Sequence, residues 1–212
     1  MKRVDDYKRN TEHMGRAEKL DYTVTYYWYH MLGILAAAGI GIFLITHIAF
    51  AKERPEFTCV LVNQEIDYDR DERMEERIAD YAGLEEDEIV FDSDFQISYR
   101  DVQMTGANES SYEKFFFKWN NEELDAVIMP ESFYRYCKEL GGSFRDLDGF
   151  GVDGLPLYED AGRRSGVYIE RTRLAPELAN KTGEPLLLVF PSTGLHEENC
   201  GVFLHYIAEI GE

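Results

Sequence analysis

The strongest hydrophobic pattern in the chain is one apolar run near its N-terminus. Residues 31–51 read MLGILAAAGIGIFLITHIAFA and carry no formal charge. As an α-helix this run would be roughly 31 Å long, at about 1.5 Å per residue, which matches the hydrocarbon core of a bilayer. The pattern therefore predicts a transmembrane helix over 29–51. A core helix of a soluble protein and a cleaved signal peptide are the alternatives, and the length of the run and the polar residues before it favour a span.

The residues that flank the run predict its orientation. Aromatic residues 26–29 precede it, and Lys52 and Arg54 follow it, as is typical of the two lipid–water boundaries. Residues 1–30 contain six Lys or Arg, against three in residues 52–71. Because Lys and Arg stay on the cytoplasmic side, we expect residues 1–28 to form a cytoplasmic tail and residues 56–212 an extracellular domain at the cell membrane.

Beyond the run, short apolar segments alternate with segments of helical spacing. This alternation predicts an α/β domain built around one mixed sheet. The segment at 89–97 is expected to break near 92–94, and the strand at 166–169 is expected at a sheet edge. Asp69 or Asp71 is expected to cap the first helix of the domain, and Gly83 to end it. The predicted strands are 57–63, 89–97, 124–129, 166–169 and 185–190, and the predicted helices are 71–82, 111–120, 131–140 and 196–210.

The charge of the chain excludes one class of partner. The net charge is −19, and nearly all of it lies after residue 30, because residues 1–30 hold six bases and five acids. A domain this acidic lacks the basic face that binds nucleic-acid phosphates. An acidic surface that keeps the domain soluble is the simplest interpretation, and a basic partner is the alternative.

Candidate chemistry in the sequence is sparse. The three cysteines, Cys59, Cys137 and Cys200, are an odd number without a close pair, so at most one disulfide could form and buried free thiols are expected. His196 and Cys200 share a helix face but lack further zinc ligands, and the Asp67-x-Asp-x-Asp71 motif lacks the later glycine and glutamate of a calcium loop. We therefore predict no metal, no cofactor and no enzymatic activity.

Three segments resemble a known family. They are EELDAVIMPESF at 122–133, GSFRDL at 142–147 and GLPL at 154–157. In this order they are similar to one lobe of type II periplasmic, or extracytoplasmic, solute-binding proteins. The resemblance covers residues 57–157 and implies a periplasmic-binding-protein-like fold. The N-terminal aromatic run and single span also resemble small membrane-anchored proteins of Gram-positive, Firmicutes-type bacteria.

The chain is too short for the second lobe of such proteins, so any binding site would belong to a truncated lobe. Where strand ends meet helix starts, polar side chains are the candidates for binding a ligand. The start of the helix at Glu131 and Ser132 also offers backbone N–H groups that suit an anion. The candidate ligand-binding residues are Asn63, Asp92, Asp94, Glu131, Ser132 and Phe133.

Gly33, Ala37 and Gly41 form a stripe of small residues along one face of the predicted span. Such a stripe favours close pairing with a second copy or with another membrane protein. Two functions follow from the sequence. The first is an extracytoplasmic binding module for a small solute or peptide, which a closed pocket lined by Tyr112, Phe133 and Tyr134 would favour. The second is a non-enzymatic accessory subunit of a larger membrane complex, which a flat apolar patch would favour.

Overall fold

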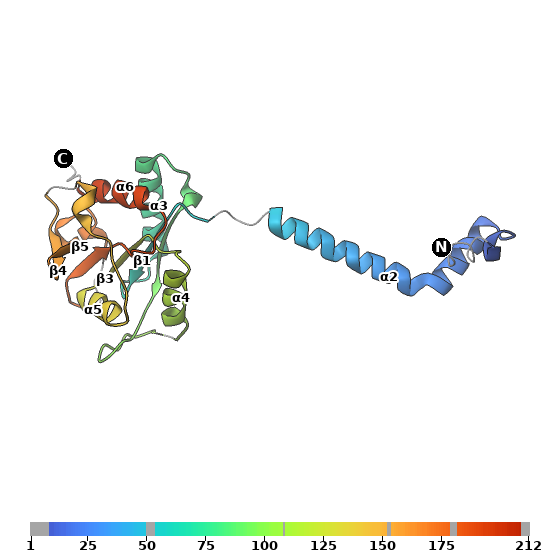
Figure 1. Cartoon of the computed structure of the whole chain (residues 1–212), viewed down its shortest axis with the longest axis horizontal. Coiled ribbons are helices and arrows are strands. Elements are labelled where there is room, and N and C mark those ends of the chain that lie inside the picture. The colour runs from blue at the N-terminus through green and yellow to red at the C-terminus, as the bar shows by residue number, and fades with distance from the viewer. Residues whose placement is uncertain (1–8, 50–53, 108, 152–153, 179–181, 209–212) are drawn as a thin grey trace. The chain divides into compact units, whose positions relative to one another are not determined.

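The computed structural model describes residues 9–49, 54–107, 109–151, 154–178 and 182–208 (Figure 1). The chain divides into two compact units, residues 1–53 and residues 54–212. The first unit contains the long helix α2, Arg16–Ala49. The second contains an α/β domain with one sheet.

Helix α2 contains a stretch that could cross a membrane or act as a signal sequence. This stretch is Trp28–Thr46, and none of it is buried within the chain. Its polar residue Thr46 donates its hydroxyl to the carbonyls of Ile42 and Phe43, at 2.9 and 3.0 Å, so this hydroxyl is hydrogen-bonded within the helix itself. The helix begins at Arg16, so it extends into the segment predicted as a tail. Residues 50 and 51 of the predicted span lie outside the described residues.

The domain has a six-stranded mixed sheet, as the alternating pattern predicted, with strand order β2-β1-β3-β6-β5-β4. Strand β1 is parallel to β2 and β3, and the remaining neighbours are antiparallel. The sheet thus has a parallel half and an antiparallel half, joined where β3 meets β6. The strands are β1 Phe57–Val62, β2 Ile89–Phe95, β3 Ala126–Pro130, β4 Leu157–Asp160, β5 Arg163–Tyr168 and β6 Leu186–Val189.

Helices cover both faces of the sheet. Figure 1 shows α3 and α6 on one face and α4 and α5 on the other. The two hydrophobic cores divide in the same way, with Met74 and Phe203 in one and Phe115 and Phe133 in the other. Because both faces are covered, β1, β3 and β6 are buried along their whole length and read as unbroken apolar runs. The α-helices of the domain are α3 Tyr68–Ala82, α4 Glu109–Asn120, α5 Glu131–Glu139 and α6 Glu197–Ala208, and short 3-10 helices cover Glu86–Glu88, Leu147–Phe150, Ile169–Arg171 and Ala175–Glu177.

Three local predictions were wrong. Helix α3 begins earlier than expected, because Asp67 caps it by accepting the N–H of Arg70. Strand β2 does not break at 92–94, but its pairing with β1 shifts register there, between Asp92 and Phe95. Strand β5 lies between β6 and β4, so the edge of the antiparallel half is β4. Gly83 ends α3 as predicted, in a left-handed conformation with φ 71°.

The three cysteines are buried free thiols, as expected. Burial raises the pKa of Cys59 well above its ordinary value and raises the pKa of Cys137 and of Cys200 to about 12. A thiol with so high a pKa is a poor nucleophile and a poor metal ligand. These side chains therefore serve as core residues in the folded chain.

Candidate functional site

One edge of the sheet gathers most of the polar strand ends. Strand β5 runs in the same direction as β1, β2 and β3, since it is antiparallel to β6, which is antiparallel to β3. The carboxyl ends of these four strands therefore lie at the same edge as the starts of β4 and β6. In open α/β sheets this is the edge at which ligands usually bind.

In the parallel half of this edge, Asn63 extends the pairing of β1 with β2. It has a φ of 57°, in the left-handed region, and its side chain is fully buried. Its Oδ1 accepts the N–H of Ile97 at 2.7 Å, and its Nδ2 donates to the carbonyl of Ile97 at 3.0 Å. The side-chain amide therefore pairs with Ile97 as the backbone of a neighbouring strand would, and both of its polar atoms are hydrogen-bonded within the protein.

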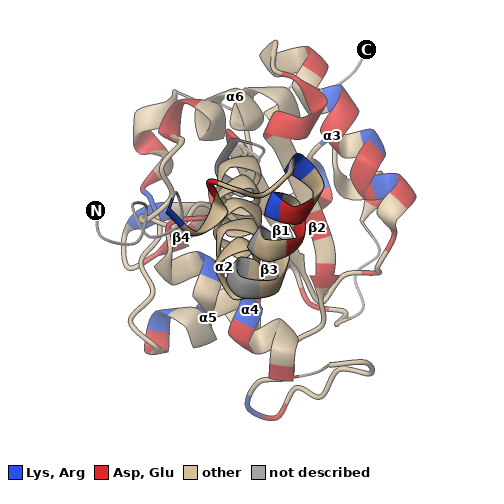
Figure 2. Ribbon diagram, turned by 90° about the vertical axis from the view of Figure 1, so that its right-hand side faces the viewer, with Lys and Arg blue, Asp and Glu red and all other residues tan. Residues whose placement is uncertain are grey.

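In the parallel half, two carboxylates of α3, those of Asp71 and Glu75, accept backbone N–H groups of β2. Asp71 pairs with Arg70 at 2.7 Å, and both side chains are at most 5% exposed. The other oxygen of Asp71 accepts the N–H of Ser93, and one turn later Glu75 accepts the N–H of Phe91 at 2.7 Å. These N–H groups lie on alternate residues of β2, whose neighbour in the sheet is β1. Helix α3 thus covers the outer edge of β2, and Figure 2 shows the acidic residues along this helix.

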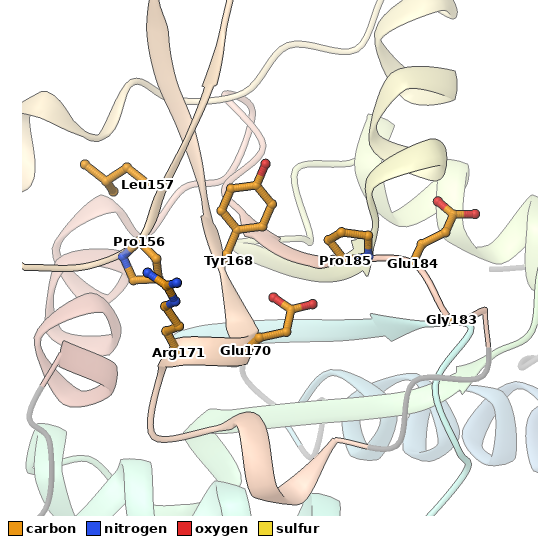
Figure 3. A pocket seen from close by; sticks show the side chains of 8 residues that line it. All are labelled: Pro156, Leu157, Tyr168, Glu170, Arg171, Gly183, Glu184 and Pro185. Atoms are coloured by element: carbon orange, nitrogen blue, oxygen red, sulfur yellow. The ribbon is translucent and has the colours of Figure 1, made fainter.

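In the antiparallel half, the same edge is hollowed into an open groove of about 760 Å³. Figure 3 shows Tyr168 at the centre of the groove, Leu157 and Arg171 on one side, and Pro185 and Glu184 on the other. The groove combines an aromatic ring, three apolar side chains and three charged ones. It is lined by Pro156, Leu157, Tyr168, Glu170, Arg171, Gly183, Glu184 and Pro185.

Backbone N–H groups hold both carboxylates of the groove. Glu170 accepts the N–H of Leu186 at 2.8 Å, at the start of β6. Glu184 accepts the N–H of Ser132 at 3.1 Å, in the first turn of α5. The neighbouring N–H of Glu131 donates to the carbonyl of Pro185 at 3.1 Å. The sequence-based expectation of free N–H groups for an anion at Glu131 and Ser132 was therefore wrong, because the chain fills this position with its own carboxylate.

The electrostatic environment of Tyr168 is set mainly by burial and by acids. Burial raises the pKa of its phenol, the carboxylates of Glu131 and Glu170 raise it further, and Arg135 opposes them. Glu131 and Arg135 also form an ion pair one helical turn apart. Carboxylates and a guanidinium thus act on the phenol of Tyr168 in opposite directions.

The structure separates most of the predicted ligand-binding residues from this groove. Phe133 is fully buried and packs between Tyr99 and Phe115, with ring centroids 4.8 and 5.3 Å away. Asp92 lies within β2 and pairs with Lys114 at 2.9 Å, and Asp94 is exposed on the same strand. Ser132 adjoins the groove through Glu184, but its hydroxyl is hydrogen-bonded to Tyr99 at 2.7 Å.

Tyr112 and Tyr134, which were expected to line a closed pocket, form contacts outside the groove. Tyr134 is buried, stacks on Phe144 at 4.6 Å and shares hydrogen bonds with Asp160 and Ser165. Tyr112 forms a hydrogen bond with Tyr136 at 3.0 Å between α4 and α5. Among the described residues, no group of three or more His, Cys, Asp or Glu side chains is placed to hold a metal ion.

Sequence reasoning missed Tyr168, Glu170 and Glu184. A signal was present, since Tyr168 and Glu170 fall at the end of one predicted strand and Glu184 directly precedes another. Their meeting depends on β6 lying antiparallel between β3 and β5, which the pattern of one sequence does not reveal.

Comparison with protein-family models, with curated proteins and with solved structures gives no significant match. What the fold itself defines is an α/β domain with a mixed sheet, in a chain that also carries one apolar N-terminal helix. Its function must be argued from the geometry of the groove.

Proposed function

We propose that this protein is a membrane-anchored, extracytoplasmic binding module whose groove at Tyr168 takes a small solute or a short peptide. The observation that carries the proposal is the open groove at the carboxyl edge of the sheet. Its volume of about 760 Å³ is in the range of small-molecule sites, which combine apolar walls with a few placed polar groups. The short segments at 122–133, 142–147 and 154–157, which resemble one lobe of solute-binding proteins in sequence, point to the same class of function.

The anchor in this proposal is α2. The stretch Trp28–Thr46 is long and apolar enough to span a bilayer. The excess of Lys and Arg before it supports a cytoplasmic N-terminus and an extracellular domain. Protease added to intact cells should then digest the domain and leave a membrane-protected N-terminal fragment. A domain that resists protease until the cells are lysed would contradict this orientation, and a mature chain that begins after residue 51 would show that α2 is a signal sequence.

Thermal unfolding of the full chain in detergent tests the binding function. A ligand present at a hundred times its dissociation constant adds about 2.7 kcal/mol of stability. We expect at least one class among sugars, amino acids and short peptides to raise the melting temperature, and Tyr168→Ala to remove this rise. Tyr68→Ala is the control, because Tyr68 is 68% exposed on α3 and outside the groove. If no class shifts the melting temperature, the accessory-subunit function is favoured instead.

A further inference from the structure

We propose that the ligand of this protein is the carboxyl-terminal segment of a polypeptide, which binds in extended form as an additional strand alongside β4. This inference rests on the proposed function and names the class of its ligand, because such a strand would end at the groove. It follows from three features: the open outer edge of β4, the groove at the start of that edge, and the position of Arg171.

The first feature is the outer edge of β4. Among the described strands, β4 pairs with β5 alone. The N–H of Tyr168 donates to the carbonyl of Pro156 at 2.8 Å, so Pro156 faces β5, and the next residue, Leu157, directs its backbone N–H and carbonyl outward. The extra residue of the bulge in this pair lies on β5, so the alternation continues along β4 and Glu159 also faces outward. In the described part of the chain, no group is hydrogen-bonded to these outward backbone groups.

The opposite edge of the sheet is closed by the chain itself. Along β2, Asp71 and Glu75 of α3 accept the N–H groups of Ser93 and Phe91. An edge left open presents N–H and carbonyl groups at the spacing of another strand, which is how some domains bind extended peptides. A second copy of this domain fits the edge of β4 less well, because the acidic Glu159 of each copy would approach the other.

The second feature is the groove, which lies at the start of the same edge. Pro156 and Leu157 line it on one side, and Tyr168 lies at its centre (Figure 3). A peptide that pairs with Leu157 and continues past Pro156 would therefore reach the groove within one or two residues, at about 3.3 Å per residue. There the ring of Tyr168 and the apolar walls favour burial of the last side chain of the peptide.

The third feature is the position of Arg171. In Figure 3 its guanidinium lies beside Pro156, at the start of β4. It is exposed, and among the described residues no carboxylate pairs with it, since that of Glu170 accepts the N–H of Leu186 instead. A strand added antiparallel to β4 has its carboxyl terminus at this end. A guanidinium binds a carboxylate through two parallel hydrogen bonds, so the charges are complementary and set the direction of the peptide.

The experiment uses a pool of acetyl-tetrapeptides built from Val, Leu, Thr and Tyr, prepared once as free carboxylic acids and once as carboxyl-terminal amides. Each pool is passed over the immobilised full chain in detergent micelles, with empty micelles as the blank, and retained peptides are quantified by mass spectrometry. We expect the acids to bind at least about tenfold more tightly than the amides, the factor for one lost hydrogen bond to a charged group. Because the backbone and the carboxylate are common to every member, a pool of acids that is not retained overturns the inference.

Matched variants locate the peptide. Glu159→Pro removes one outward N–H at an edge position, where proline is tolerated, and Glu159→Ala removes the same side chain but keeps the N–H. Glu159→Pro should weaken binding about fivefold, as for one neutral hydrogen bond, and Glu159→Ala should not. Arg171→Gln should weaken the acids about tenfold and leave the amides unchanged.

Amide hydrogen exchange, followed by NMR of the full chain in micelles, tests the strand pairing directly. A bound peptide should slow the exchange of the N–H groups of Leu157 and Glu159. The N–H of Tyr158 is the internal control, because it faces β5 and should not change. Binding of a peptide without slower exchange at Leu157 and Glu159 would overturn the added strand.

The outcomes separate this inference from the function on which it rests. A sugar or amino acid that binds through Tyr168, while no peptide is retained, would overturn the peptide and leave the binding groove. Self-association of the full chain that is lost in Glu159→Pro would overturn it in favour of a second copy at this edge. Failure of every ligand to bind the wild-type chain would overturn both proposals. The comparison of acids with amides on the wild-type chain decides the question even if a variant does not fold.

Discussion

At the carboxyl edge of the sheet, the parallel half is filled by buried side chains, while the antiparallel half contains an open groove. At the ends of β1 and β2, buried side chains such as Asn63 and Asp71 form hydrogen bonds to the backbone around them. At the ends of β5 and the start of β6, the side chains Tyr168, Glu170 and Glu184 line an open groove. Polar residues bond to the backbone in both halves, but in the parallel half they are buried, while in the antiparallel half Glu170 and Glu184 line a groove that is open.

Strand direction explains this difference. Parallel strands bring every strand-to-helix turn to the same edge, so the turns after β1 and β2 crowd together with backbone groups that need partners. Antiparallel strands place alternate turns at opposite edges. The β4–β5 turn, at Ala161 and Gly162, therefore lies at the other end of the sheet, and the segments around Pro156 and Gly183 enclose a space at this edge. In this sheet, a polar residue at a strand end is therefore a better indicator of a binding site in the antiparallel half than in the parallel half.

The largest expected effect comes from breaking the buried ion pair of the parallel half. Asp71→Ala leaves the guanidinium of Arg70, only 3% exposed, with the carbonyl of Glu65 but without its carboxylate partner, and it also removes the acceptor for the N–H of Ser93. Loss of one partner from a buried pair costs about 3–5 kcal/mol. We expect the free energy of unfolding to fall by about 4 kcal/mol, as measured by urea unfolding of the full chain in detergent and followed by the fluorescence of the buried Trp119.

The matched control for this substitution is Asp69→Ala, in the same turn of α3. Asp69 is exposed, so its loss should change the free energy of unfolding by less than about 0.5 kcal/mol. Equal effects of the two substitutions would show that the parallel half is not closed by this ion pair.

The next largest effect is expected from Asn63→Ala. The substitution leaves the N–H and the carbonyl of Ile97 without their side-chain partners, and it puts alanine at a φ of 57°, a left-handed conformation that asparagine tolerates better. Two buried groups that lose a partner, together with the backbone strain, predict a loss of about 3 kcal/mol in the free energy of unfolding.

Asn63→Gly separates the two causes. Glycine adopts the left-handed conformation without strain but cannot form the two hydrogen bonds. Its loss of stability should therefore be about 1 kcal/mol smaller than that of Asn63→Ala, when both are measured by the same urea unfolding. If the glycine variant is as stable as the wild type, the amide does not hold the segment that follows β2 in place.

The sequence predicts the fold well where pattern alone determines the structure. Strands buried on both faces, such as β1 and β6, appear as unbroken apolar runs, and Gly83 marks the end of α3 because only glycine adopts its conformation freely. The start of α3 was predicted too late because three aspartates, Asp67, Asp69 and Asp71, can each act as a cap. The structure selects Asp67 and uses Asp71 inside the protein.

The candidate site was less predictable because it depends on which strands become neighbours. Asn63 and Phe133 were chosen for their places at strand ends and helix starts, and the structure buries both. Glu184 lies 52 positions after Ser132 in the chain, and its carboxylate accepts the N–H of Ser132 in the first turn of α5. No local pattern encodes that contact, since it requires β6 to lie next to β3.

A groove residue should affect binding more than stability, in contrast to Asn63. Tyr168 is partly exposed and packs edge-to-face against Tyr158, with ring centroids 5.6 Å apart. Tyr168→Ala should therefore lower the free energy of unfolding by about 1 kcal/mol, while it abolishes any stabilisation by ligand. A loss as large as that of Asn63→Ala in urea unfolding would mean that the groove, like the parallel half, mainly supports the fold.

The smallest effect is expected at Glu75, whose carboxylate accepts the N–H of Phe91 on the outer edge of β2. Burial raises the pKa of Glu75 above its ordinary value of 4.5, the N–H of Phe91 lowers it, and the nearby acids Asp71, Glu72 and Asp92 raise it. The net direction is upward, so the folded state binds this proton more tightly than the unfolded state does. The resulting contribution to stability is complete below pH 4.5 and is lost as the pH rises through the raised pKa.

Glu75→Gln tests this contribution, because glutamine keeps an acceptor for Phe91 and has no charge to titrate. At pH 7 the variant should be more stable than the wild type by less than about 1 kcal/mol, since solvent screens a half-buried group. The difference should shrink as the pH is lowered toward 4.5, in urea unfolding at a series of pH values. A variant that is less stable than the wild type at pH 7 would show that the charge itself strengthens the contact with β2, and that this edge is held by electrostatics rather than by a hydrogen bond that neutral groups can supply.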